Sequence, residues 1–418
     1  MSKPEQCDQS QENERRKAGG WLKRIIAVFF GISLAWLMLE LLMRVAFPLF
    51  PYTIQAALRE VRRTPFTEER ILPQQIWQED IHYQLISRAD VANEYQFPDP
   101  RVGFYVTTKN WLDPNSHVGF RVPSADWEPR WPVDAVIVGD SFTFCYTEYT
   151  DCWVQRLESE HGMSVVNLGQ VATGSISHLN ILTTFGLPHQ PRMVIWQWYG
   201  NDFNDDYGMA LMNDQISAVD APEAPQLLPP APPSPSPLVK WLEKNSAVYW
   251  IMRTVTTPKP DLYKYQRFVD PHQVKDGEMV FSYGRPYTSK SSDLSAVKNQ
   301  IGMGLSQNAI LETRDLLASQ DVQLVILLIP SKEEVYRRWT EPTLGAPQLS
   351  LLAQGRLEMV SFCQESALLC LDSTTALTAV AEQGTPVYLP YDTHLNVAGN
   401  QVITDELWRF LTEHQLTD

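Results

Sequence analysis

The chain is poor in cysteine and in positive charge, and it lacks the common metal-binding motifs. Five cysteines among 418 residues are too few for a disulfide scaffold. The formal net charge of −15 argues against a nucleic-acid-binding protein, because such proteins carry a basic face. No Cys-x-x-Cys or His-x-x-x-His spacing occurs, so the sequence predicts neither a metal site nor another cofactor. A hydrophobic content of 44% instead indicates a globular protein with a sizeable core.

The placement of the few cysteines is informative. Cys7 is alone near the N-terminus, whereas Cys145 and Cys152, and Cys363 and Cys370, form two close pairs. In an oxidising compartment each pair could form a disulfide bridge. In a reducing one they would be four buried or free thiols, and the sequence leaves both alternatives open.

One long apolar run lies near the N-terminus. Residues 25–43 are almost entirely apolar, interrupted by Ser33 and Glu40. As a helix the run would extend for about 28 Å, close to the hydrocarbon thickness of a bilayer. The sequence therefore predicts a transmembrane helix.

The same run fits a buried core helix or a cleaved signal peptide less well. Too little chain precedes it to bury a core helix on all sides, and no small-x-small motif follows it as in a cleaved signal peptide. Lys23 and Arg24 before the run predict a cytoplasmic N-terminus by the positive-inside rule. We expect a single-pass membrane protein whose remaining chain is extracytoplasmic.

From residue 131 onward, apolar strands alternate with helical patterns. Strands are predicted over 133–138, 165–168, 193–198, 322–329 and 368–371. Helices are predicted over 153–157, 176–185, 305–317, 357–366 and 397–411. This alternation implies a parallel sheet with right-handed crossovers. A proline-dense stretch at 221–238 interrupts it, which suggests an insertion that serves as a lid, a docking surface or a passive loop.

Four short motifs follow predicted strand ends or precede the last helix. They are Gly139-Asp140-Ser141-Phe142, Asn167-Leu168-Gly169-Gln170-Val171-Ala172-Thr173-Gly174, Gly200-Asn201-Asp202 and Asp392-Thr393-His394-Leu395-Asn396. In an open α/β sheet, ligands bind outside the carboxyl ends of the strands, so we expect the motifs to meet there. Each motif alone could be a helix cap, a turn or a surface histidine. Their joint occurrence in this order favours a catalytic site.

The residue types fit nucleophilic catalysis. Ser141 needs a base and the base needs an orienting acid, and His394 and Asp392 can supply them. In an extended segment Asp392 and His394 face the same side. Asp372, at another predicted strand end, is the substitute acid. Backbone N–H groups at Ser141 and in the second motif, with the Asn201 amide, can form an oxyanion hole.

In this order the motifs resemble those of the SGNH (GDSL-type) hydrolase superfamily, over about residues 115–415. The resemblance implies a three-layer α/β/α sandwich with a parallel sheet, similar to flavodoxin. It also implies that Ser141 is the nucleophile, that Asn201 is the side-chain oxyanion donor, and that Asp392 and His394 are acid and base. The lead-in Gly119-Phe120-Arg121 and the anchored N-terminus are similar to membrane-tethered bacterial members, which implies the bacterial inner membrane.

Two features depart from the common pattern of the superfamily. One residue separates Asp392 from His394 instead of two, as in the branch of the alginate O-acetyltransferase proteins. Ala172 stands where the oxyanion glycine is common, and its backbone donor survives this change if φ is negative. Gly169 and Gly174 are the alternates. The motif Gly-x-Ser-x-Gly is absent, which argues against the α/β-hydrolase family.

These features define an expected domain organisation. We expect a cytoplasmic tail over 1–20, a transmembrane helix over 21–44, and a linker with an N-terminal extension over 45–130. The SGNH-like catalytic domain follows over 131–418, with the insertion at about 205–300.

Three functions remain open at this stage. The first is an esterase or deacylase of an extracytoplasmic, carbohydrate-linked acyl ester. The second is an O-acyltransferase that modifies an extracellular polysaccharide. The third is a catalytically silent partner protein, which the complete Ser-Asn-Asp-His set argues against.

Overall fold

The computed structural model describes residues 27–46, 76–96, 103–217, 272–284 and 292–417, except 114, 131 and 391, and a few isolated residues between 219 and 252 and at 24. The chain divides into two units, which are described separately: Met1–Pro73 with Pro232–Tyr265, and Gln74–Ala231 with Gln266–Asp418. The predicted cytoplasmic tail and most of the proline-dense stretch lie outside the described residues.

The first unit contains the apolar N-terminal helix. Ala27–Val45 is a helix of 19 residues, long and apolar enough to cross a membrane. Glu40, the acid within it, accepts the backbone N–H groups of Ala247 at 2.9 Å and Val248 at 3.1 Å, and lies 3.5 Å from Arg44. An ionisable side chain in such a helix is expected to have polar partners, and Glu40 has them.

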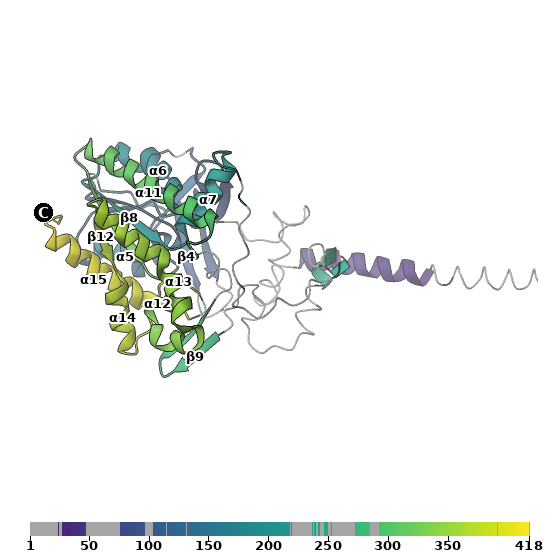
Figure 1. Ribbon diagram of the computed structural model, residues 1–418. Helices are drawn as coiled ribbons and strands as arrows, with labels where there is room; N and C mark the ends of the chain where they lie inside the picture. Colours follow the sequence, from purple (N-terminus) through teal and green to yellow (C-terminus); the bar gives the residue numbers. More distant parts are fainter. Residues whose placement is uncertain are drawn as a thin grey trace, which may run out of the picture. The chain divides into compact units, whose positions relative to one another are not determined.

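The second unit is built on a parallel sheet of five strands (Figure 1). Their spatial order is β12-β11-β8-β6-β7, and every neighbouring pair is parallel. In chain order this is the 2-1-3-4-5 arrangement of flavodoxin-like folds. The predicted fold class is therefore confirmed. The strands are β6 (Ala135–Val138), β7 (Val165–Asn167), β8 (Met193–Tyr199), β11 (Gln323–Ile329) and β12 (Leu369–Asp372).

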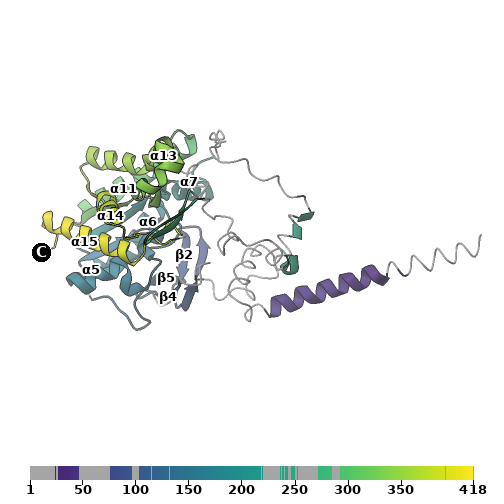
Figure 2. The same ribbon diagram turned by 90° about the horizontal axis from the view of Figure 1, so that it is seen from below.

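Helices cover both faces of this sheet (Figures 1 and 2). Successive residues of β6 alternate between the two faces: Ala135 and Ile137 join one apolar cluster, Val136 and Val138 the other. The first cluster is covered by α5 (Trp153–His161), α12 (Lys332–Val335), α14 (Thr374–Glu382) and α15 (Val397–Glu413). The second is covered by α6 (Ser175–Ile181), α7 (Asp202–Met212), α11 (Val297–Ala318) and α13 (Arg337–Glu365).

A second sheet precedes the parallel one in the chain, within the segment that sequence reasoning assigned to an extension. It is antiparallel, in the order β1-β2-β5-β4-β3. Its strands are β1 (Trp77–Asp80), β2 (Gln84–Arg88), β3 (Ala92–Gln96), β4 (Gly103–Lys109) and β5 (Val118–Arg121). Gln170 of the second motif binds it, because its Oε1 accepts the Ser87 N–H at 2.6 Å and its Nε2 donates to the Gly119 carbonyl at 2.8 Å. This antiparallel sheet is thus fastened to the candidate oxyanion loop.

Residues 272–284 of the expected insertion pack near the last motif. They form a hairpin of β9 (His272–Asp276) and β10 (Met279–Tyr283). The Ser282 N–H donates to the Pro390 carbonyl at 2.7 Å. The buried Lys332 ammonium donates to the carbonyls of Ser282 at 2.9 Å and Leu389 at 3.2 Å. The hairpin therefore supports the loop that leads to His394.

Both cysteine pairs are disulfide bridges in the structure, Cys145–Cys152 and Cys363–Cys370. Each closes a loop of the same sequence separation, seven residues. The first bridge lies between α4 (Ser141–Phe144) and α5, and the second joins α13 to β12. Only the first lies next to the Ser141 motif.

Candidate active site

The turn that carries Ser141 is held by three polar contacts. Asp140 caps α4, because its Oδ1 accepts the Phe142 N–H at 2.9 Å. Gln197, buried in β8, accepts the Asp140 N–H at 3.0 Å and the Thr143 hydroxyl at 2.9 Å. A Cβ on Gly139 would lie 2.2 Å from the Thr143 hydroxyl and 2.4 Å from Gln197 Oε1, so only glycine fits there. Sequence reasoning missed Gln197, although a polar residue inside an apolar strand was the available signal.

The structure brings the predicted nucleophile, base and acid together. His394 Nε2 lies 2.7 Å from Ser141 Oγ. His394 Nδ1 is hydrogen-bonded to Asp392 Oδ1, which also accepts the His394 backbone N–H at 3.0 Å. Asp372, the substitute acid, instead forms an ion pair with Arg356. It also accepts the backbone N–H of Thr374, the first residue of α14, at 3.1 Å. The arrangement has the connectivity of a Ser-His-Asp triad.

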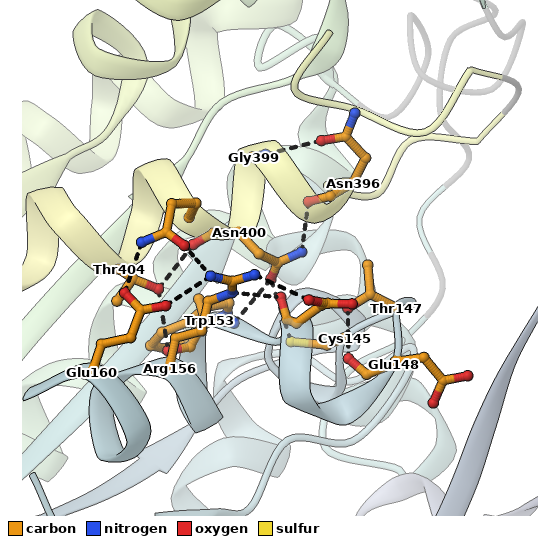
Figure 3. A network of polar contacts seen from close by, with 12 residues as sticks. Cys145, Thr147, Glu148, Trp153, Arg156, Glu160, Asn396, Gly399, Asn400 and Thr404 are labelled. Carbon is orange, nitrogen blue, oxygen red and sulfur yellow. Dashed lines mark hydrogen bonds and ion pairs between the residues drawn. The ribbon is translucent and has the colours of Figure 1, made fainter. Parts of the chain in front are cut away.

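The start of α15 is linked by polar contacts to the start of α5 (Figure 3). Asn396 caps α15 by accepting the Gly399 N–H at 2.9 Å. Asn400 accepts the Trp153 N–H, the first of α5, at 3.1 Å and donates to the Asn396 carbonyl at 2.9 Å. The Trp153 indole in turn donates to the Phe142 carbonyl at 2.9 Å. This chain of contacts links the helix after His394 to the turn that carries Ser141.

A cavity of about 370 Å³ opens at the triad. Ser141, Ala172 and Asn201 line it, together with His394. The alternates Gly169 and Gly174 are not among the described lining residues. A Cβ on Gly169 would lie 2.6 Å from the Phe144 nitrogen, and one on Gly174 would lie 2.4 Å from the Asp202 carbonyl oxygen. These two glycines allow close packing behind the cavity.

The remaining walls of the cavity come from several elements. Trp77 of β1 and Leu85 of β2 belong to the antiparallel sheet, and Tyr146 follows α4. Polar groups also line it, among them Ser331 and Arg356. The antiparallel sheet thus contributes directly to the candidate site.

The backbone of Ala172 differs from the expected one. Its φ is +50°, in the left-handed region, whereas the sequence analysis required a negative φ for a retained donor. This conformation costs a residue with a Cβ about 1–2 kcal/mol. Such local strain is common at functional sites because the surrounding structure imposes it. Here the loop around Ala172 is held by Gln170.

Asn201 lies at the start of α7 with its amide next to an acid. Its Nδ2 donates to Asp205 Oδ2 at 2.8 Å. An amide nitrogen carries two hydrogens, so one remains for a ligand in the cavity that Asn201 lines. The Asp205 contact orients this amide.

Behind Asn201 lies a group of buried titratable side chains. Burial raises the pKa of Asp140 to about 6, that of Asp206 to about 8, and that of Asp202 well above its usual range. Burial also lowers the pKa of His178 to about 3, so its ring is neutral. His178 Nδ1 lies 4.0 Å from Asp202 Oδ2, and both side chains have no exposed surface. At neutral pH Asp206 therefore keeps its proton, whereas Asp140 is mostly ionised.

Comparison with known proteins agrees with this geometry. Residues 287–417 match the family model described as the SGNH hydrolase-like domain of the acetyltransferase AlgX. This part of the chain is therefore similar to an SGNH hydrolase-like domain, and the similarity supports an enzyme that acts on ester bonds, as a hydrolase or as an acyltransferase. The match includes Asp392 and His394 and begins after Ser141 and Asn201, and the roles of all four residues remain predictions.

Solved structures similar to this chain are distant in sequence. A lipolytic protein of the G-D-S-L family from Desulfitobacterium hafniense is 13% identical, with a TM-score of 0.35, over 66% of this chain and 99% of its own. A catalytic mutant of the acetylxylan esterase Axe2 from Geobacillus stearothermophilus is 13% identical, with a TM-score of 0.36, over 67% of this chain and 94% of its own. No curated protein sequence matches the chain.

The raised pKa of Asp206 makes stability depend on pH. Between about pH 4, the unfolded pKa, and about pH 8, the folded protein keeps a proton that the unfolded chain releases, so the free energy of unfolding falls as pH rises. Asp206→Asn removes this term, and its unfolding free energy should fall less steeply by about 1.4 kcal/mol per pH unit between pH 5 and 7. Urea unfolding of the full chain at several pH values measures the slopes. The exposed Asp126→Asn is the control, and equal slopes in all three proteins would contradict the assignment.

The strain at Ala172 predicts opposite effects of two substitutions. Ala172→Gly should raise or preserve stability and keep activity, because glycine adopts positive φ without a Cβ clash. Ala172→Val should lower stability by about 1–2 kcal/mol and reduce activity, because a β-branched residue is a true outlier there. Gln190→Gly, at φ 49° outside the cavity lining, is the matched control for the backbone effect alone. Thermal melts measure stability and ester turnover measures activity. If Ala172→Gly lowers both as much as Ala172→Val does, the backbone at Ala172 is not strained.

Proposed function

We propose that this protein is a membrane-anchored serine esterase or deacylase that acts on an extracytoplasmic, carbohydrate-linked acyl ester. The 2.7 Å contact between Ser141 Oγ and His394 Nε2 carries the proposal, because a serine becomes a nucleophile only beside a base. Asp392 completes the triad through His394 Nδ1. The four motifs would otherwise have no reason to converge on one cavity.

The reaction proceeds through an acyl-enzyme. His394 Nε2 takes the Ser141 proton as Oγ attacks the acyl carbon, and Asp392 holds the imidazole in the tautomer that allows this. The backbone N–H group of Ser141 and the amide of Asn201 stabilise the oxyanion, and the Ala172 N–H is not assigned to this role because its φ is positive. His394 then protonates the leaving alcohol, and a water activated by the same base releases the acid.

The anchor and the compartment are proposed on two observations. The helix Ala27–Val45 has the length and apolar composition of a membrane span, and basic residues precede it, which favours a cytoplasmic N-terminus. Both cysteine pairs are bridged, and bridges persist in oxidising compartments such as the bacterial periplasm. The catalytic domain would then lie outside the cytoplasm, where cell-surface carbohydrates are found.

A second candidate function is O-acyl transfer to a polysaccharide. The family model that matches the Asp392–His394 region is that of an acetyltransferase, and the single-residue spacing of these two residues also favours that branch. The chemistry up to the acyl-enzyme is the same. In transfer, a sugar hydroxyl replaces water as the group that His394 deprotonates.

Substitution of the triad tests catalysis itself. Ser141→Ala should abolish labelling by a fluorophosphonate probe, and Ser141→Ala and His394→Ala should each lower ester turnover on the order of 10³-fold or more. Asn201→Ala should keep Ser141 labelled but reduce turnover about 100-fold, because one oxyanion donor is lost. Ser319→Ala, exposed at the end of α11, is the control. Turnover that survives in the Ser141 variant would refute an enzymatic role for this site.

The two reaction outcomes are separable with one substrate. The full chain in detergent receives an activated acetyl ester with or without an oligosaccharide, and the products are analysed by mass spectrometry. Hydrolysis gives free acetate at a rate that the sugar does not change. Transfer gives an acetylated sugar at the expense of acetate, and this product should disappear in Ser141→Ala.

A further inference from the structure

Arg121, at the end of β5, is a buried cation whose hydrogen bonds in the described chain go to main-chain carbonyls. Its side chain belongs to a residue that is only 1% exposed. Nη1 donates to the carbonyls of Phe144, at 2.9 Å, and Cys145, and Nη2 donates to those of Thr147, at 2.6 Å, and Tyr105, at 3.2 Å. Three of these four acceptors belong to the short segment 144–147, which begins at the last residue of α4, the helix of Ser141.

Aromatic rings complete the surroundings of this cation. The guanidinium carbon lies 4.8 Å from the ring centre of Phe104 and 5.4 Å from those of Phe144 and Tyr149. Burial lowers the pKa of Arg121 to about 10, so the guanidinium is still charged at neutral pH. A buried charge is costly unless it is compensated, and here carbonyls accept from Nη1 and Nη2 and aromatic rings surround the cation, while the buried Nε–H has no acceptor among the described residues. The segment 144–147 is therefore tied to the antiparallel sheet by one side chain.

The segment held in this way carries Tyr146 to the catalytic histidine. The ring centres of Tyr146 and His394 are 4.0 Å apart with an interplanar angle of 33°. Arg121 binds the carbonyls of Cys145 and Thr147, the residues on either side of Tyr146. The Cys145–Cys152 bridge restrains the same segment. The backbone on both sides of the Tyr146 ring is thus fixed.

We propose that Arg121 is a positioning residue that acts on catalysis through Tyr146. The Tyr146 ring, which is nearer to His394 than the Phe142 ring at 4.9 Å, stabilises the imidazole. This inference rests on the proposed triad. During attack by Ser141 the imidazole becomes an imidazolium, and an aromatic face next to it favours the charged form. Such a contact acts mainly in the transition state and affects kcat more than KM.

The kinetics of Tyr146 and Arg121 variants test this assignment. With a small acetyl ester, Tyr146→Leu should lower kcat about 10-fold with KM changed less than about 3-fold, and Tyr146→Phe should restore most of the kcat because it keeps the ring. Arg121→Met should lower kcat about 10-fold, and the double variant Arg121→Met/Tyr146→Leu should be no slower than the slower single variant, because both act through one contact. Unchanged kcat in Tyr146→Leu, or additive losses in the double variant, overturns the proposal.

Matched controls separate this effect from loss of stability. Val118→Ala weakens the packing of the same strand, β5, without touching the segment 144–147, and should leave kcat unchanged. The double variants Cys145→Ser/Cys152→Ser and Cys363→Ser/Cys370→Ser open loops of equal sequence separation, so their melting temperatures should fall similarly. Only the first should lower kcat, and an equal loss of kcat in both overturns the proposal.

The proposal can still be tested if Arg121→Met does not fold. The half-buried Tyr146 tolerates substitution better, so the Leu and Phe variants then decide alone. Ser141→Ala in the same assay gives the background. If ester cleavage does not depend on Ser141, the proposed function fails and this inference with it. If cleavage depends on Ser141 but not on the Tyr146 ring, only this inference fails.

Discussion

The hydrogen bond between Ser141 and His394 joins residues 253 positions apart, and the site exists only where both chain segments are held in register. The sheet delivers Ser141 at the end of β6, while His394 comes from the loop before α15. A bond of 2.7 Å leaves little room for drift between these elements. The contacts of Asn400 with Trp153 and Asn396 supply that register, because they join the first turn of α15 to the start of α5.

Polar side chains are buried next to the proposed triad, and their burial lowers the stability of the fold. Gln197, Asp202, Asp206 and His178 are fully buried beside the Ser141 and Asn201 turns, where apolar residues would pack more favourably. Burial raises the pKa of both carboxyls, that of Asp206 to about 8, which lowers the cost of burying them because the neutral form is favoured. These buried polar side chains support the candidate oxyanion loop from below. Preorganised hydrogen-bond donors are usually the largest source of catalysis in acyl transfer.

Sequence reasoning reached the parallel sheet and the four motifs because both leave local signals. Uninterrupted apolar runs such as 322–329 indicate strands covered on both faces, and the structure places β11 there. The antiparallel sheet was missed because its strands carry interior polar residues such as Ser87 and therefore lack an uninterrupted apolar run. The positive φ of Ala172 left no signal either, since alanine gives no hint of a left-handed backbone.

The antiparallel sheet is best understood as part of the catalytic machinery and not as a spacer. Gln170 fastens it to the loop of Ala172, and Arg121 fastens it to the segment that bears Tyr146. Trp77 adds a wall to the cavity from the same sheet. A passive extension would need none of these contacts, and surface loops rarely bury a charged side chain. The end of β6 and the loop before α15 therefore supply the proposed triad, while the antiparallel sheet fixes the loops around it and lines the cavity.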